Sequence, residues 1–246
     1  MFGFSWGVLG HRIVGQVAEA YLTKNTKAKI KNLLGNESIA LAANWGDFIK
    51  SDSNYNYLSS WHYDNFPAGL SRDSFYTFLR SDTTDGAYKA LNFLQGELKR
   101  KDLPVEKQAM YLKLLIHFVG DIHQPLHMGR LEDLGGNRIR VLWFNDNVNL
   151  HQVWDERLVN FQQLSYTEYE KAINHPTPAQ RKAWANSPVE DWLYESYQCA
   201  EKIYAGVSPD QKLGYRYNFD YISMVNEQLL KGGLRLAKLL NEIYGK

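Results

Sequence analysis

Histidine and aspartate recur at a spacing of four residues along one stretch of this sequence. His117 precedes Asp121 by four positions, and His151 precedes Asp155 by four. On an α-helix, residues four apart project from one face, one turn apart. Neutral imidazole and carboxylate groups are zinc ligands, and two ligands on one rigid turn lose little entropy when a metal binds. The spacing therefore indicates a metal site.

A third pair and two separate histidines strengthen this interpretation. His123 precedes His127 by four residues, and His11 and His62 lie earlier in the chain. Any single pair is explained as well by a salt bridge within a helix or by a histidine that caps one. Several pairs in one stretch are harder to place in an ordinary core, because buried polar groups need partners. We therefore predict a metal site.

The composition excludes several other classes of protein. The 246 residues carry a formal net charge of +1, and 44% are hydrophobic and 14% aromatic. That is enough apolar material for one sizeable core, and it argues against disorder. Near-neutral charge argues against a broad basic surface, but it leaves room for a local cationic site. The only cysteine, Cys199, excludes an internal disulfide, and we expect it to be a small buried residue on a helix.

Apolar residues recur mostly at helical spacing, which predicts a mainly α, single-domain protein. Helices are expected near 10–22, 30–34, 39–49, 85–99, 106–122, 151–161, 178–203 and 221–243. The alternation of Ile139, Val141 and Trp143 with other residues predicts a short strand or β-hairpin. Segment 51–84 is predicted to be a long ordered loop, and Gly232-Gly233 to interrupt the last helix. No apolar run approaches the roughly 18–20 residues that span a bilayer.

Motifs along the whole chain resemble the S1/P1 nuclease family. The segment HFVGDIHQPLH, from His117 to His127, resembles the signature of that family. Other blocks follow in the family's order: WGxxGH at 6–11, NWGD at 44–47, WHY at 61–63, GGN at 135–137, NLHxxWD at 149–155 and KGGLRLA at 231–237. The resemblance covers nearly the whole chain. It implies one catalytic domain over 6–246, with the helical fold that the family shares with zinc-dependent bacterial phospholipase C.

The resemblance implies a cluster of three zinc ions, with ligands assigned position by position. The first zinc takes Asp47, His62, His117 and Asp121; the second takes His127, His151 and Asp155; the third takes His11, Asp121 as a bridge, and the backbone nitrogen and oxygen of Trp6. In the family this tryptophan is the mature N-terminus, and its free amine is the ligand. Five residues precede Trp6 here. We expect residues 1–5 to be a signal remnant or residues added in cloning, and the native enzyme to begin at Trp6 and to be secreted or periplasmic.

The reaction implied by the resemblance is hydrolysis of phosphodiester bonds in single-stranded DNA and RNA, with 5′-phosphate products, together with removal of the 3′-phosphate of nucleotides. Three zinc ions and three aspartates would give the site a charge of about +3, which attracts phosphate. A water between the first two zincs, its pKa lowered from about 15.7 towards 7, would attack phosphorus. The third zinc would stabilise the leaving 3′-oxygen.

The catalytic residues that we expect at the reacting phosphate are Asp47, Lys50 and Asn137. Lys50 lies where family members can carry a basic residue, and it is expected to stabilise the pentacoordinate phosphate; a solvated surface lysine is the alternative. Asn137 is expected to bond a phosphate oxygen or orient water, and a turn residue after two glycines is the alternative.

A base-binding site is expected in the stretch from Trp61 to Phe66. Tyr63 is predicted to stack on an unpaired base, with core packing beside His62 as the alternative. Either Asp64 or Asn65 is predicted to bond the edge of the base.

Two rival functions remain open at this level. The enzymatic rival is a zinc phospholipase C, against which the blocks at Asp47, 135–137 and 231–237 speak. No basic amphipathic segment for membrane docking is seen, so we expect no stable membrane association. We also expect the protein to be a monomer. The rival of another class is a non-catalytic zinc-binding protein. His123 is not a ligand in the family pattern and is expected to be a supporting or surface residue.

Overall fold

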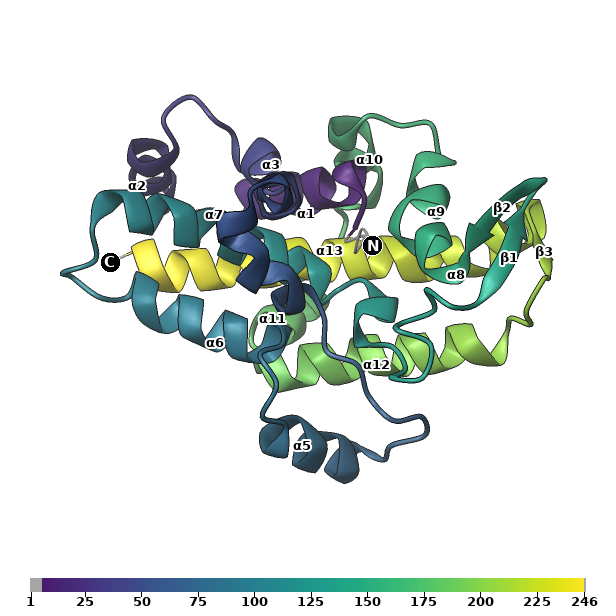
Figure 1. Ribbon diagram of the computed structural model, residues 1–246. Helices are drawn as coiled ribbons and strands as arrows, with labels where there is room; N and C mark the ends of the chain where they lie inside the picture. Colours follow the sequence, from purple (N-terminus) through teal and green to yellow (C-terminus); the bar gives the residue numbers. More distant parts are fainter. Residues whose placement is uncertain (1–5, 246) are drawn as a thin grey trace.

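A long C-terminal helix organises the molecule. The computed structural model describes residues 6–245, so the predicted signal remnant at 1–5 lies outside the described residues. α13 (Tyr215–Tyr244) runs along the molecule, and α1 (Val8–Ala20) and α7 (Val105–Asp121) pack against it. α6 (Ala87–Leu98) and α12 (Val189–Ala205) lie below them in the view of Figure 1. The mainly α prediction is confirmed.

The remaining helices are mostly short and surround this centre. They are α2 (Lys24–Leu34), α3 (Ile39–Ala42), α4 (Trp45–Phe48), α5 (Arg72–Ser81), α8 (Leu150–Gln152), α9 (Leu158–Asn160), α10 (Tyr166–Ile173) and α11 (Pro178–Ala185), with 3₁₀ helices η1 (Ile49–Ser51), η2 (Ser53–His62) and η3 (Pro125–Met128) and a π-helical turn η4 (Val153–Arg157). Within the described residues, no helix is both long and apolar enough to cross a bilayer.

A small three-stranded sheet closes one end of the molecule, at the right of Figure 1. β1 (Arg140–Trp143) and β2 (Asp146–Asn149) form the predicted hairpin, with Val141 opposite Val148. β3 (Lys212–Leu213) pairs in parallel with the other edge of β1 and was not predicted, because two residues carry no periodic signal. Val141 and Trp143 are buried, as their alternation predicts.

The predicted interruption at Gly232-Gly233 is wrong, since α13 is continuous from residue 215 to 244. The two glycines lie where α1 crosses α13. A Cβ atom at Gly233 would meet the Cβ of Val17 at 2.4 Å. The glycines therefore permit close approach of α1 and α13. α13 tolerates the low helix propensity of glycine because tertiary packing stabilises the helix.

Three other expectations need correction. Segment 51–84 is not a loop throughout, because it contains η2 and also α5, whose N-cap Ser71 and buried Phe75 and Leu79 set its position. The predicted helix over 178–203 is two helices, since Pro188 separates α11 from α12. The predicted helix over 39–49 is divided among α3, α4 and η1.

Candidate metal centre

The buried C-terminal half of α7 carries the first two predicted ligands. His117 Nε2 lies 3.2 Å from Asp121 Oδ2, so the spacing of four places both on one helix face. His11, from α1, reaches the same carboxylate, with its Nε2 3.4 Å from Asp121 Oδ1 and its ring stacked on His117 at 4.0 Å. A Cβ atom at Gly120 would lie 2.7 Å from the His11 ring, so this glycine admits the histidine.

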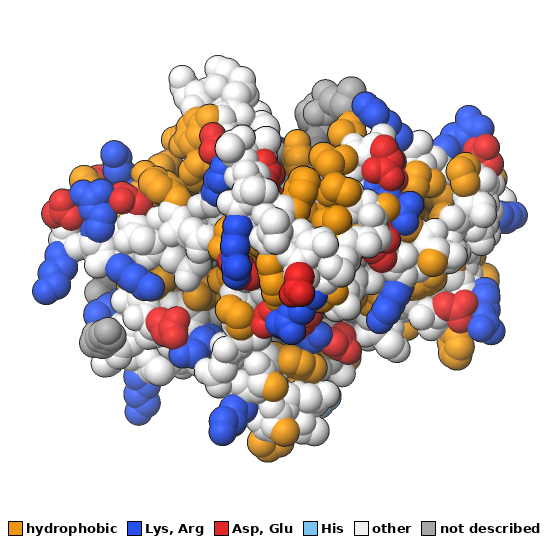
Figure 2. Space-filling model, turned by 90° about the horizontal axis from the view of Figure 1, so that it is seen from below, with side chains coloured by type: hydrophobic (Ala, Val, Ile, Leu, Met, Phe, Trp, Pro, Cys, Tyr) orange, Lys and Arg blue, Asp and Glu red, His pale blue; other side chains and the backbone are white. Residues whose placement is uncertain are grey.

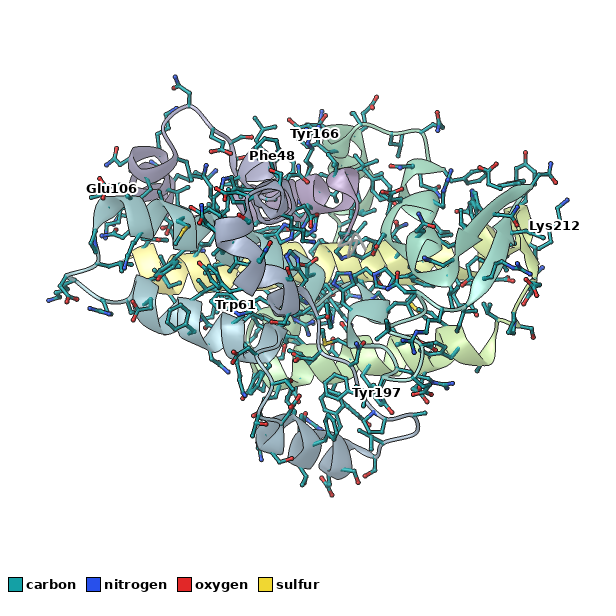
Figure 3. The ribbon with its side chains drawn as sticks, viewed as in Figure 1. Phe48, Trp61, Glu106, Tyr166, Tyr197 and Lys212 are labelled. Atoms are coloured by element: carbon teal, nitrogen blue, oxygen red, sulfur yellow. The ribbon has the colours of Figure 1, made fainter. Side chains whose placement is uncertain are left out.

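Two more predicted ligands, from separate segments, complete this side of the centre. His62, at the end of η2, places Nδ1 2.8 Å from Asp121 Oδ2 and 3.1 Å from His117 Nε2. Asp47, on α4, lies 3.7 Å from His117 Nε2. In Figure 3 the labelled neighbours Phe48 and Trp61 mark these two segments. Asp47 is the accessible member, with 32% of its side chain exposed, so the centre opens to solvent there.

A second group forms around Asp155. His151 Nε2 lies 3.2 Å from Asp155 Oδ2, and His127 Nε2 lies 3.5 Å from Asp155 Oδ1. Asp155 sits in the π-helical turn η4, and such turns recur at functional sites. His127 Nδ1 is also 3.5 Å from Asp121 Oδ1, so the two groups adjoin. The described residues thus hold three sets whose ligand atoms lie within 4.8 Å of one another: His11, His117 and Asp121; Asp47, His62 and His117; His127, His151 and Asp155.

The hydrogen bonds of three histidines fit metal ligation. Each places Nδ1 against a backbone carbonyl oxygen: His117 on Ala43 at 2.6 Å, His127 on His62 at 2.8 Å and His151 on Gly135 at 2.6 Å. When Nδ1–H donates to a carbonyl, the Nε2 lone pair is free to bind a cation. In all three residues Nε2 lies within 3.5 Å of a carboxylate oxygen of Asp121 or Asp155.

Several buried polar atoms at this centre have no hydrogen-bond partner among residues 6–245. A buried unpaired donor or acceptor costs about 1–3 kcal/mol, and such atoms rarely gather in one place. A cation among them would satisfy them together, so the residues present fit a metal. The atoms are Nδ1 and Nε2 of His11, Nε2 of His62, Nε2 of His127, Oδ1 of Asp121 and Oδ2 of Asp155.

The two buried carboxylates are held in the ionised form. Burial by itself raises the pKa of Asp121, but His117 and His62 lower that pKa well below its usual value. Burial likewise raises the pKa of Asp155, and His151 outweighs it so that the net pKa is lowered. Both carboxylates are therefore ready to bind a cation without first losing a proton.

The surroundings shift the pKa values of three histidines in different directions. Burial lowers the pKa of His62 to about 4, despite the opposing effect of Asp121, and burial also lowers the pKa of His11. These imidazoles are neutral and can ligate directly. Burial lowers the pKa of His117 too, but Asp121 and Asp47 outweigh it and raise the net pKa. Cation binding at His117 Nε2 therefore competes with protonation of that atom.

The third i,i+4 pair does not act as a pair. His127 lies in η3, whereas His123 follows α7 and points away from the ligands. His123 Nδ1 bonds the carbonyl of Val119 at 2.7 Å, and its Nε2 lies 2.9 Å from Nη1 of the buried Arg235. Glu195 pairs with Arg235 on the other side. His123 therefore fastens the end of α7 to α13, which agrees with a supporting role.

Gln124 is a further residue at the centre, and only its place in the HQPLH block could have pointed to it. Its side-chain nitrogen donates to Asp155 Oδ1 at 2.5 Å, and its side-chain oxygen accepts from the amide of Leu126 at 2.6 Å. It is fully buried. Gln124 thus orients a ligand carboxylate and caps η3, which carries His127.

Three other predicted residues surround the centre. Trp6 is fully buried, and the amide of Gly7 donates to the carbonyl of Asp155 at 2.8 Å, which places Trp6 beside the second group. Lys50 Nζ lies 2.6 Å from Asp47 Oδ1, at the exposed side of the centre. Asn137 donates to the carbonyl of Leu134 at 2.8 Å, two residues from the glycine whose carbonyl holds His151.

The predicted base-binding segment is extended, and its side chains alternate. Asp64 is buried, and its Oδ2 accepts from the amide of Tyr88 at 2.8 Å, in the first turn of α6. Burial raises the pKa of Asp64 to about 7. Tyr63 is 42% exposed, and Asn65 is half-buried. In extended backbone, alternate side chains face opposite sides, so Tyr63 and Asn65 share the side that Asp64 does not.

Comparison with known proteins adds to this geometry. The family model of S1/P1 nucleases matches residues 6–245. The chain belongs to the S1/P1 nuclease family. It is 32% identical to Endonuclease 5 of Arabidopsis thaliana over 270 residues, which cover 97% of this chain and 90% of the relative. Nuclease P1 of Penicillium citrinum is 28% identical, over 98% of both chains. As a member of the S1/P1 nuclease family, the protein is a hydrolase with a nucleic-acid substrate.

Proposed function

We propose that this S1/P1 nuclease is a zinc-dependent endonuclease that hydrolyses phosphodiester bonds of single-stranded DNA and RNA to 5′-phosphate products and removes 3′-phosphate from nucleotides. The observation that carries the proposal is the convergence of eight predicted ligand side chains into three adjoining groups with unpaired buried ligand atoms. Nitrogen and oxygen donors without cysteine suit zinc. Three ions are the number proposed, with Asp121 shared by two of them.

Zinc ions bound there would lower the pKa of water and polarise a phosphoryl oxygen. The side chains of this protein supply the surroundings. Asp121 and Asp155 are buried and ionised, so their negative charge holds cations where water is excluded. The exposed edge at Asp47 is the way in for a phosphate.

Lys50 and Asn137 are proposed to hold the reacting phosphate. The ammonium of Lys50 is tethered to Asp47 at the open side of the centre, where it can also reach a phosphate oxygen. Asn137 lies two residues after Gly135, whose carbonyl oxygen bonds the His151 ring. On the face shown in Figure 2, basic and acidic side chains are interspersed, so attraction for phosphate depends on this local site.

Tyr63 and Asn65 are proposed to hold a base. Tyr63 is exposed directly after the ligand His62, so a base stacked on its ring lies next to the scissile phosphate. Between the two candidates for the base edge, Asn65 is favoured, because the Asp64 carboxylate is buried against the start of α6. A base in a duplex is already stacked and paired, which favours single-stranded substrates.

We infer in addition that the protein works outside the cytoplasm, with Trp6 as the mature N-terminus. A free amine at Trp6 would be a far better metal ligand than the amide of an internal residue, and Trp6 lies beside Asp155. The intact mass of naturally secreted protein tests this inference. A mass that starts at Trp6 supports it, and a mass that includes Phe4 and Ser5 contradicts it.

The function is tested with three substrates on one zinc-loaded preparation: single-stranded DNA, a 3′-mononucleotide and phosphatidylcholine. We expect the protein to release acid-soluble nucleotides from single-stranded DNA. A chelator should abolish this activity, and added zinc should restore it. Hydrolysis of phosphatidylcholine with inert DNA would instead support the phospholipase C, and tight zinc binding with inertness towards all three would support the binding protein. His117→Ala is expected to lose activity in the first assay.

A further inference from the structure

A polar pocket of about 280 Å³ lies on the sheet, next to the metal centre. Arg138 and Arg140 line it, and Arg140 is paired with Asp210, which is not one of the lining residues. The amide side chains of Asn137, Asn147, Asn149 and Gln152 line it too, and none of its described lining residues is acidic. Guanidinium and amide groups without a carboxylate are the donors that bind phosphate oxygens. The pocket therefore favours an anionic ligand.

Both arginines keep donors for such a ligand. Arg138 uses Nη1 to donate to the carbonyl of Glu132 at 3.0 Å. Arg140 uses Nε to donate to Asp210 at 2.5 Å. A guanidinium has five N–H groups, so each of these contacts orients the side chain and leaves other N–H groups for a phosphate.

Asn149 and Gln152 line the pocket and flank His151, a predicted ligand of the metal centre. Asn149 caps α8 through a reciprocal pair of hydrogen bonds with Gln152, and α8 carries His151. Asn149 Nδ2 lies 3.5 Å from Asn137 Oδ1, and the Gly135 carbonyl near it holds the His151 ring. The pocket and the second ligand group therefore lie on the two sides of α8 and the 135–137 turn.

We propose that this pocket is a second phosphate subsite, which holds a backbone phosphate of a single-stranded polynucleotide beside the one that is cleaved. The inference rests on the proposed nuclease function. The lining offers donors to phosphate oxygens, and its described residues include no aromatic ring for a base, so the contact is independent of base sequence. A mononucleotide has one phosphate, which occupies the metal centre, and so gains nothing from the pocket. The subsite therefore favours polymers over mononucleotides.

The test compares two substrates in Arg138→Ala, Arg140→Ala and the double variant. The substrates are an oligothymidylate of about twenty nucleotides and a 3′-mononucleotide. The matched control is Arg100→Ala, which also removes an exposed arginine paired with carboxylates. Arg100 follows α6, at the end of the molecule opposite the sheet (Figure 1). Zinc content of every variant is measured alongside the kinetics.

The expected result is a rise in KM for the oligonucleotide of roughly 3- to 10-fold in the double variant, with kcat, zinc content and mononucleotide hydrolysis unchanged. The slope of log(kcat/KM) against log salt should become shallower by about 0.7 for each phosphate that no longer meets an arginine. Arg100→Ala should match wild type.

Three outcomes overturn the subsite. They are an unchanged KM and salt slope, an equal loss on both substrates, and the same loss in Arg100→Ala. Failure of the proposed function is distinguishable, because the wild-type protein would then leave both substrates intact, and the subsite would fall with it.

Discussion

Gln124 shows how a single side chain supports the metal centre. It donates to Asp155 Oδ1 from a position between the ligands Asp121 and His127. Residues that orient a metal ligand typically contribute 10- to 100-fold to metal affinity or activity. We predict that Gln124→Ala lowers zinc affinity by roughly 10- to 100-fold, measured by competition with a chromogenic chelator.

The matched control for that variant is Gln162→Ala, which removes two side-chain hydrogen bonds away from the ligands. It should bind zinc as wild type does. Wild-type zinc affinity in Gln124→Ala would show that the hydrogen bond does not orient Asp155.

The side chain of Cys199 gives a pH-dependent prediction. Cys199 lies on α12 as expected but is half-buried, and this partial burial raises the pKa of its thiol to about 11. A raised pKa favours the protonated thiol, so the reactive thiolate is scarce at neutral pH and increases until the pH approaches 11. We expect alkylation of native protein by iodoacetamide to increase about tenfold per pH unit up to pH 10, whereas the unfolded chain levels off above its thiol pKa of about 8.5. A native rate that levels off near pH 8.5 would contradict the burial.

The residues of the three candidate metal-binding sets were predictable as neighbours from their types, their spacing and the family motifs. His117–Asp121 and His151–Asp155 are each encoded within one helical turn. The supporting residues were not. Gln124 is an ordinary amide in the sequence, and Arg235 meets His123 only after α13 packs on the end of α7. Their roles depend on partners far away in the chain, which local spacing cannot reveal.

The crossing of α1 and α13 gives a prediction at the scale of the element. A methyl group at Gly233 would lie 2.4 Å from Val17, whereas one at Gly96 on α6 would have no described atom within 4 Å. Overpacking typically costs about 1–3 kcal/mol, and an alanine in an open helix position gains up to about 1 kcal/mol over glycine. We predict that Gly233→Ala lowers the free energy of unfolding and Gly96→Ala raises it, in urea titrations of zinc-loaded protein. Equal stabilisation by both substitutions would mean that the two helices are not in close contact.

The elements themselves were only partly predictable. Long amphipathic segments such as α7 and α13 are evident from their apolar periodicity, and the hairpin from its alternation. The wrong prediction at Gly232-Gly233 has a physical origin. A glycine in a helical pattern can mark either a break in the helix or a position where another helix packs closely, and the sequence does not distinguish the two. α5 escapes prediction because it lies in a polar, aromatic segment, where Phe75 and Leu79 are its only buried residues.

Metal binding should contribute to the stability of the whole molecule. The ligands come from α1, α4, η2, α7, η3, α8 and η4, so the site exists only when these segments are folded together. Binding to the folded state alone stabilises it, by about 4 kcal/mol for one site at a free ion concentration of 1,000 Kd. For a protein of this size that corresponds to a Tm increase of roughly 10 °C.

We therefore predict that chelation lowers the Tm by about that amount, measured by calorimetry, and that added zinc restores it. His175, which lies outside the three ligand sets, provides a control: His175→Ala should show the same metal-dependent shift as wild type. An identical Tm with and without chelator would be incompatible with metal ions at the buried groups.

Elemental analysis of active enzyme, together with cleavage of single-stranded DNA by the same sample, tests the proposed metal centre most directly. We predict close to three zinc ions per chain, fewer in His117→Ala, and activity that falls and returns with the metal. Full nuclease activity in protein that contains no transition metal would contradict the proposed chemistry.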